Sequence, residues 1–157
     1  MAEFRVVVRN LRNQPVVIVN FPLLHDGSPM PTLFWLVARQ ESESVARVES
    51  QGGVKVCQSV IDAKQIEDSH VEYARLRGKQ IPLDFNGLRP SGGVGGTRRG
   101  VKCLHAHLAW FLAGGSDPVG SWTAEQINIT RDDYLVEIPS DELYFDSLTR
   151  RPGQSTP

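Results

Sequence analysis

The stretch "FRVVVRNLRNQPVVIVN", residues 4–20, sets the fold class, because two β-branched runs flank a short polar break. Valine and isoleucine favour strands, and a short break between two such runs is typical of a hairpin. A short helix over residues 4–13 is the alternative. The next apolar run, "TLFWLVA" at 32–38, is continuous and lies between a proline and charged residues. It predicts a strand buried on both faces, with Trp35 in the core.

Two further segments have helical composition. The first, "RQESESVARVESQGG" at 39–53, offers Ser42 or Ser44 as an N-cap and ends at Gly52 and Gly53. The second, "DAKQIEDSHVEYARLRGKQ" at 62–80, carries apolar residues at helical spacing. The charged residues of the first helix are expected to form a solvated face; they are Glu41, Glu43, Arg47 and Glu49.

The remaining segments complete a mixed pattern. Residues 54–60, "VKVCQSV", are compatible with a strand, and residues 81–96 predict a long loop. A helix is expected from near Thr97 to Gly114 and Gly115. A turn at 116–122, "SDPVGSW", and a late strand at 134–139, "YLVEIP", follow.

These elements predict a single α+β domain over residues 1–139, with a flexible tail at 140–157. The sheet is expected to be small, mixed or antiparallel, and packed against two to three helices. A chain of 157 residues that is 40% hydrophobic suits one core.

Charge and cysteine content restrict the possible partners. The formal net charge of −1 provides no overall field for nucleic acid or an anionic membrane, so neither is expected as a partner. Two cysteines are too few for a disulfide framework; one disulfide is possible, but reduced thiols are the simpler interpretation. The sequence shows neither a secretory signal nor an apolar run long enough to span a bilayer, so we expect a soluble cytoplasmic protein.

The stretch "SGGVGGTRRGVKCLHAH", residues 91–107, is the main candidate site. Its glycines allow the backbone to approach a ligand, and a helix beginning at Thr97 would direct free amides and a positive dipole at the loop. Basic residues in the first turns add charge, so a phosphate-bearing or carboxylate ligand is the leading hypothesis. The candidate ligand-binding residues are Gly92, Gly93, Gly95, Gly96, Thr97, Arg98, Arg99 and Lys102. The alternative is a flexible loop whose glycines serve only the backbone geometry.

Known phosphate-binding fingerprints do not fit this loop. A P-loop requires Lys directly after its last glycine, whereas Val101 intervenes before Lys102 and Cys103 follows where Ser or Thr is needed. The dinucleotide fingerprint is also incomplete after Gly93 and Gly95. No cofactor is therefore assigned.

Cys103 and His107 are the candidate catalytic pair, because residues four apart share a face of a helix. A thiolate near a helix N-terminus has a lowered pKa, and a nearby histidine can act as its base. His105 would point toward the apolar stripe and is expected to be a core histidine with a backbone partner. The alternative for the pair is a small buried cysteine beside a satisfied histidine. No metal site is assigned, since the sequence lacks zinc-ligand spacing.

Several long blocks of this chain resemble the DUF501 family of uncharacterised, mainly actinobacterial proteins. The blocks are "FPLLHDGSPMPTLFWLV", the helix end from Glu49 to Gly53, "GGVGGTRRGVKCLHAHLAWFLAGG" and "DPVGSW", within residues 3–122. The resemblance implies no residue roles. Genes of the family often lie near those of a small divisome coiled-coil protein and an exopolyphosphatase-like enzyme, which hints at cell division or phosphate metabolism. Family members often carry cysteine where this chain has Ala38.

Three functions follow as hypotheses. The first is binding of a small anionic ligand at the glycine loop, with Cys103 and His107 adjacent. The second is a non-enzymatic module that binds an unidentified protein partner and is linked to cell division or polyphosphate metabolism. The third is a cysteine-dependent hydrolase or transferase.

Overall fold

The N-terminal residues form the predicted hairpin. In the computed structural model, which describes residues 4–143, β1 (Phe4–Asn10) pairs antiparallel with β2 (Pro15–Asn20). The Asn10 side chain closes the turn by accepting hydrogen bonds from the Arg12 and Gln14 amides. Asn13 takes a left-handed conformation with φ of 64°. Asparagine tolerates this conformation better than most residues, so the polar break suits a turn.

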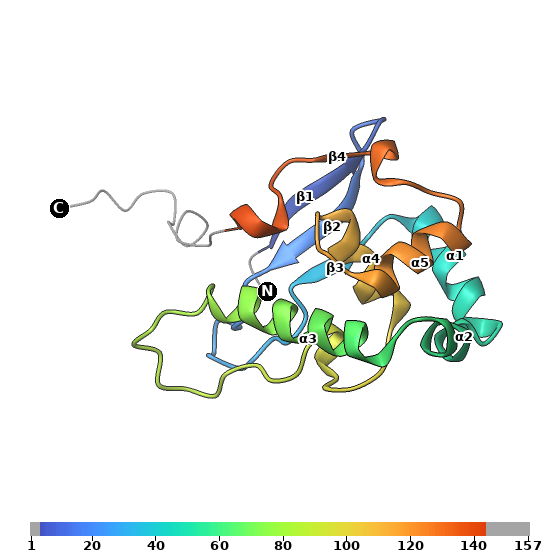
Figure 1. Ribbon diagram of the computed structural model, residues 1–157. Helices are drawn as coiled ribbons and strands as arrows, with labels where there is room; N and C mark the ends of the chain where they lie inside the picture. Colours follow the sequence, from blue (N-terminus) through green and yellow to red (C-terminus); the bar gives the residue numbers. More distant parts are fainter. Residues whose placement is uncertain (1–3, 144–157) are drawn as a thin grey trace.

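Two short strands complete an antiparallel sheet in the order β3-β2-β1-β4. They are β3 (Phe34–Leu36) and β4 (Tyr134–Val136), the latter within the predicted late strand. Figure 1 shows the sheet in the upper part of the fold, with the helices below it and to its right. The fold is therefore α+β, as predicted.

β3 is an edge strand, which corrects the prediction of a strand buried on both faces. Successive side chains of a strand point to opposite faces. Phe34 is fully buried against the core, whereas 41% of Trp35 is exposed. An unbroken apolar run did not distinguish a central strand from an edge strand, and the prediction that Trp35 lies in the core is wrong.

The part of the chain that the structure describes contains five α-helices, more than the two to three expected. They are α1 (Arg39–Ser50), α2 (Gly53–Val60), α3 (Ala63–Gly78), α4 (Leu104–Leu112) and α5 (Pro118–Gln126). The long helix predicted over 62–80 is α3. The first predicted helix is α1, although its N-cap is Ala38, with no side-chain cap, instead of Ser42 or Ser44.

Two helices stand where a strand and a turn were expected. The segment predicted as a strand over 54–60 is α2, an amphipathic helix that buries Cys57 and follows a left-handed Gly52. The predicted turn at 116–122 contains the start of α5. Its N-cap, Asp117, accepts hydrogen bonds from the Val119 and Gly120 amides, and Pro118 occupies the first turn. A capping aspartate followed by proline is a helix start signal that the turn interpretation overlooked.

The hydrophobic core is centred on α4. This helix packs against β3 and α5 and is buried along almost its whole length. Trp110 is 1% exposed, and its ring meets Tyr73 of α3 edge-on at a centroid distance of 5.2 Å. Tyr73 in turn receives the Leu33 amide at its hydroxyl, 2.7 Å away, which ties α3 to the start of the edge strand. Trp110 is therefore a core residue.

α4 begins at Leu104, seven residues later than predicted. Gly92, Gly95, Gly96 and Gly100 all take positive φ values, which interrupt a right-handed helix. Thr97 is the C-cap of a single 3-10 turn (Val94–Gly96) and not the N-cap of α4, which is Cys103. Arg98, Arg99 and Lys102 therefore lie in the connecting segment and not in the first helical turns.

The start of the predicted tail packs against the core. Leu143 is 6% exposed, and its carbonyl accepts a hydrogen bond from the Gln80 side chain. The Ser140 amide donates to the Ala113 carbonyl at 2.8 Å. Residues 144–157, the rest of the predicted tail, lie outside the described residues. Within residues 4–143, no helix has the length and apolar character needed to cross a membrane.

Candidate functional site

Two buried side chains of α3 hold the glycine loop, residues 92–96, in place. The Val94 amide donates to His70 Nδ1 at 3.1 Å, and His70 Nε2 donates to the Gly100 carbonyl at 2.7 Å. Burial lowers the pKa of His70 and favours this neutral tautomer. Arg77 donates to the carbonyls of Pro31 and Gly92 at 2.9 and 2.6 Å. The loop is therefore a fixed part of the fold.

Amides of the loop are bonded within the chain. The Gly93 amide donates to the Thr97 carbonyl at 2.7 Å, and the Gly96 amide donates to the Gly93 carbonyl at 3.0 Å. The first amide of α4, that of Leu104, donates to Glu49 Oε1 at 2.8 Å. A carboxylate from α1 thus occupies the helix N-terminus where the sequence predicted an external anion.

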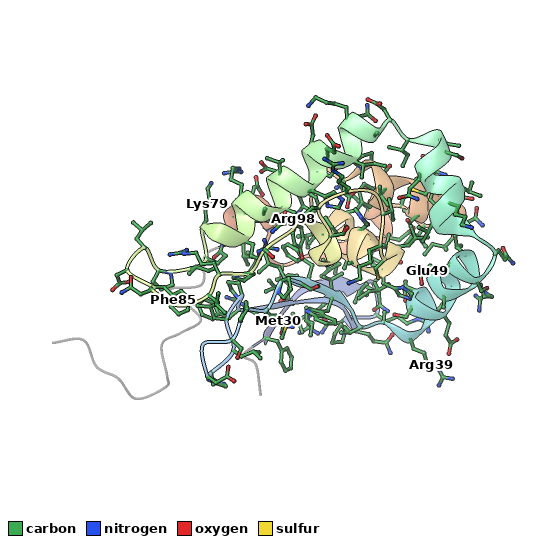
Figure 2. The ribbon with its side chains drawn as sticks, turned by 90° about the horizontal axis from the view of Figure 1, so that it is seen from below. Met30, Arg39, Glu49, Lys79, Phe85 and Arg98 are labelled. Atoms are coloured by element: carbon green, nitrogen blue, oxygen red, sulfur yellow. The ribbon has the colours of Figure 1, made fainter. Side chains whose placement is uncertain are left out.

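The basic residues of the predicted site border a shallow pocket. Arg98 and Arg99, together with Gly92 and Gly93, line a pocket of about 390 Å³ against α3, whose other lining residues are Glu67, His70, Val71 and Ala74. In Figure 2, Arg98 lies beside α3, well apart from Glu49 at the end of α1. The predicted ligand-binding residues are therefore divided between this pocket, a buried turn and the segment that leads to α4.

A second site gathers a thiol, an imidazole and a carboxylate at the start of α4. His105 Nδ1 is 3.2 Å from Glu49 Oε1, and the potential ligand atoms of Glu49, Cys103 and His105 all lie within 4.8 Å of one another. The other ring nitrogen, Nε2, donates to the Ser42 carbonyl at 3.0 Å. The Glu49 and His105 side chains are 29% and 28% exposed, so solvent reaches the cluster. We call Glu49, Cys103 and His105 the thiol cluster.

Cys103 and His105 each shift the pKa of the other toward its charged form. The hydrogen bond with Cys103 raises the pKa of His105 to about 9, against the opposing effect of burial. Burial raises the pKa of the Cys103 thiol, but the hydrogen bonds from His105 and from the Ala106 amide outweigh burial and lower it overall. The arrangement therefore favours a thiolate beside an imidazolium.

The structure gives His107 a partner other than the predicted Cys103. His107 is completely buried, and its Nδ1 is 2.6 Å from Oδ2 of Asp117. Cys103 has the extended backbone angles of an N-cap, φ −146° and ψ 115°, so helical spacing does not place its side chain above His107. His105 was expected to be a core histidine with a backbone partner. It has that partner, the Ser42 carbonyl, but it is also the histidine that lies beside Cys103.

Glu49 is the residue of the cluster that sequence reasoning missed. It lies in the last turn of α1, where the helix dipole disfavours a carboxylate. An acidic residue in that position, just before two glycines, is the sequence signal that was available. One of the four residues predicted to form a solvated face, Glu49, therefore contacts His105 and the Leu104 amide instead.

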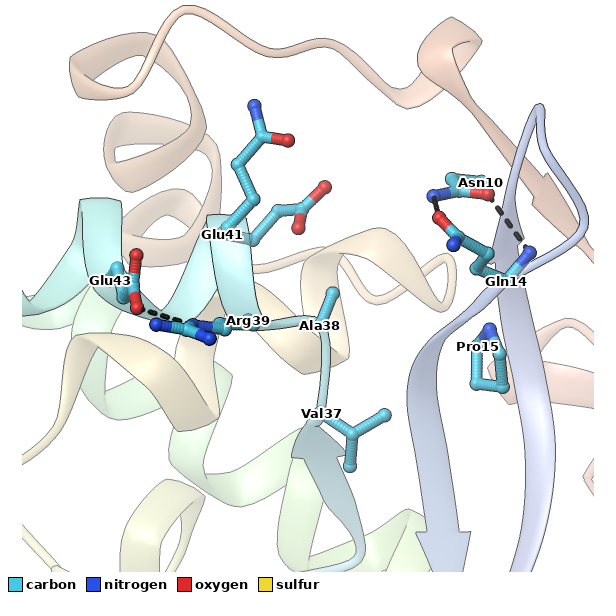
Figure 3. Close-up of a pocket in the computed structure, with 9 residues that line it drawn as sticks. Asn10, Gln14, Pro15, Val37, Ala38, Arg39, Glu41 and Glu43 are labelled. Carbon is cyan, nitrogen blue, oxygen red and sulfur yellow. Dashed lines mark hydrogen bonds and ion pairs between the residues drawn. The ribbon is translucent and has the colours of Figure 1, made fainter.

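Another pocket, of about 440 Å³, lies between the hairpin turn and the start of α1 (Figure 3). Its polar side chains bond largely to one another: Asn10 donates to Gln14, and Arg39 donates to Glu43 at 2.7 Å. Glu41 accepts a hydrogen bond from the Tyr134 hydroxyl at 3.0 Å. The lining contains neither a thiol nor an imidazole, so this pocket offers no nucleophile or base of the kind found in the thiol cluster.

Comparison with known proteins gives one family match. A family model described as a protein of unknown function, DUF501, matches residues 6–125 of the 157-residue chain. The match includes both helices that build the thiol cluster. No curated protein and no solved structure matches the chain significantly.

Proposed function

The chain belongs to the DUF501 family, and because that family has no described activity, we propose from the site itself that this protein is a cysteine-dependent hydrolase or transferase. The observation that carries the proposal is the close approach of the Cys103 thiol and the His105 imidazole at the start of α4, within 4.8 Å of each other. Cys103 is the nucleophile, and His105 is the acid and base.

The arrangement supplies what a nucleophilic cysteine needs. A thiolate is the reactive form of the side chain, and the end of a helix together with a neighbouring imidazolium stabilises it. The Ser42 carbonyl and Glu49 each contact one nitrogen of His105, so the orientation of the ring is fixed before a substrate binds. Cys103 is half-buried and not sealed in the core.

The reaction proceeds through a covalent intermediate on Cys103. The thiolate attacks an electrophilic carbon of the substrate, and a new carbon–sulfur bond forms. The leaving group departs with the electron pair of the broken bond and takes a proton from the His105 imidazolium. Water or a second acceptor, deprotonated by His105, then attacks the same carbon and releases the thiolate. The nature of this acceptor decides between hydrolysis and transfer.

The neighbourhood of Cys103 favours a substrate that carries negative charge. A Cβ placed on Gly95 would lie 3.8 Å from Cβ of Cys103, so the glycine loop forms one wall of the site. Lys102 directly precedes the cysteine and is exposed. A phosphate or carboxylate on the substrate would gain from this cation.

Selective alkylation tests the proposal. Iodoacetamide at pH 7 should modify Cys103 at least tenfold faster than a cysteine in an unfolded peptide, whereas the buried Cys57, whose pKa burial raises to about 12, should remain unmodified. His105→Gln should slow the reaction of Cys103, and Cys57→Ser serves as the matched control. Reaction of native Cys103 at or below the rate of the peptide would refute the nucleophilic role.

Binding of a small anion at the glycine loop is the second candidate function, and the pocket that contains Arg98 and Arg99 favours it. Phosphate, nucleotides or polyphosphate at 100 times the Kd should raise the free energy of unfolding by about 2.7 kcal/mol. Arg98→Ala together with Arg99→Ala should remove the effect, and Arg12→Ala, another exposed arginine, should not. No stabilisation by any of these anions at millimolar concentration would exclude this candidate.

A further inference from the structure

We propose that the thiol cluster also binds a thiophilic divalent cation, with Zn²⁺ as the expected ion, and that the bound ion blocks Cys103. The regulatory part of this inference rests on the proposed function, while the metal site itself does not. The potential ligand atoms of Glu49, Cys103 and His105 all lie within 4.8 Å of one another.

The spacing of these atoms suits a tetrahedral ion. Zinc–sulfur bonds of about 2.3 Å and zinc–nitrogen or zinc–oxygen bonds of about 2.0–2.2 Å place neighbouring ligand atoms roughly 3.3–3.7 Å apart. Glu49 Oε1 and His105 Nδ1 are already 3.2 Å apart. Only small side-chain movements are therefore needed to complete the coordination.

The groups around the ligands hold them as the second shell of a zinc site does. His105 Nε2 donates to the Ser42 carbonyl, so in the neutral ring the lone pair lies on Nδ1, which faces Glu49 and Cys103. Metal-bound histidines commonly use one nitrogen as ligand and donate the other N–H to a carbonyl or carboxylate. The Leu104 amide likewise orients Glu49 Oε1.

The donor set selects the class of cation. One thiolate, one imidazole and one carboxylate suit zinc, whereas magnesium and calcium prefer oxygen ligands alone. Across residues 4–143 no other group of three such ligands is close enough to hold an ion. Since the cluster is partly exposed, the fourth position is open to water.

Occupancy of this site would control the nucleophile. A metal-bound thiolate shares its electron pair with the ion and attacks carbon more slowly than a free thiolate does. The cation replaces the proton that His105 Nδ1 otherwise carries between Glu49 and Cys103. Zinc and the covalent reaction therefore compete for one sulfur atom.

Titration of the full chain with Co²⁺ after treatment with EDTA tests the metal site directly. One equivalent should produce thiolate-to-cobalt charge-transfer absorption, and one equivalent of Zn²⁺ should abolish that absorption. Cys103→Ser should remove the band, and Cys57→Ser should preserve it. Glu49→Gln, whose amide oxygen can still accept the Leu104 N–H, should weaken Zn²⁺ binding at least tenfold in a chelator competition while the protein remains folded. Absence of the charge-transfer band, or equal binding by Mg²⁺, would overturn the proposal.

Alkylation in the presence of EDTA or Zn²⁺ separates this inference from the proposed function. Rapid alkylation of Cys103 in EDTA that Zn²⁺ slows at least tenfold supports both. Rapid alkylation that Zn²⁺ leaves unchanged, without a charge-transfer band, overturns the metal site and leaves the nucleophile. A clear band with slow alkylation in EDTA overturns the nucleophile and leaves the metal site.

Discussion

His107 Nδ1 and Asp117 Oδ2 lie 2.6 Å apart, and both side chains are inaccessible to solvent. The other carboxylate oxygen of Asp117 accepts the Val119 and Gly120 amides at the start of α5. One buried aspartate thus joins α4 to α5 and caps the second helix. The relationship assigns Nδ1 of His107 to Asp117.

Replacement of Asp117 by alanine should therefore destabilise the fold strongly. The variant loses an N-cap, worth about 0.5–2 kcal/mol, and leaves a buried imidazole nitrogen unpaired, at about 1–3 kcal/mol. Urea denaturation should show a loss of roughly 1.5–5 kcal/mol. Asp132→Ala, at an exposed position, is the control and should change the free energy of unfolding by less than about 0.5 kcal/mol. Equal stability of the two variants would contradict a structural role for Asp117.

The close approach of the glycine loop to α3 gives a second prediction. A Cβ added at Gly93 would lie 2.4 Å from Cβ of His70 and 2.5 Å from its Nδ1. Gly93→Ala should therefore displace the loop and lower the stability by about 1–3 kcal/mol. Gly78→Ala is the matched control, because a Cβ there meets nothing within 4 Å and alanine favours a helix. A thermal melt that ranks Gly93→Ala equal to or above Gly78→Ala would show that the contact is unimportant.

The parts of the fold that were predictable are those specified by local sequence. The β-branched runs of the hairpin and the apolar spacing of α3 each indicate one structure over many residues. α2 was mistaken for a strand, because a short apolar segment such as "VKVCQSV" suits either period. The position of β3 at the sheet edge depends on strand order, which composition does not reveal.

The thiol cluster was predictable only in part. The sequence marked Cys103 and a nearby histidine, but the choice between His105 and His107 depended on where α4 begins. Glycines with positive φ prevent the helix from beginning before Leu104. The conformation of these glycines depends on tertiary contacts, such as the hydrogen bond between the loop and His70, which the local sequence does not reveal. Glu49 is 54 residues away from Cys103 in the chain, so no local pattern could connect the two.

The ionisation of His105 gives a prediction that depends on pH. Because the hydrogen bond with Cys103 is the main cause of its raised pKa, Cys103→Ala should lower the pKa of His105 from about 9 toward its ordinary value of 6.5. The raised folded-state pKa means that the imidazolium stabilises the fold fully below pH 6.5 and loses this contribution as the pH rises to about 9. NMR titration of the ring protons in EDTA measures the pKa in both proteins. An identical value in the two would exclude Cys103 as the partner, and Cys57→Ala controls for loss of a thiol.

Glu49 should stabilise the start of α4 through its contact with the Leu104 amide. Glu49→Ala removes the only carboxylate bonded to this helix N-terminus among the described residues, which should cost about 0.5–2 kcal/mol. Glu43→Ala is the control: Glu43 belongs to the same helix but forms an exposed pair with Arg39, worth at most about 0.5 kcal/mol. Hydrogen exchange gives the local measurement, since the Leu104 amide should exchange faster in Glu49→Ala and at the original rate in Glu43→Ala. Unchanged protection of Leu104 in Glu49→Ala would mean that the carboxylate does not cap α4, and the cluster would then lose the contact that fixes Glu49 beside His105.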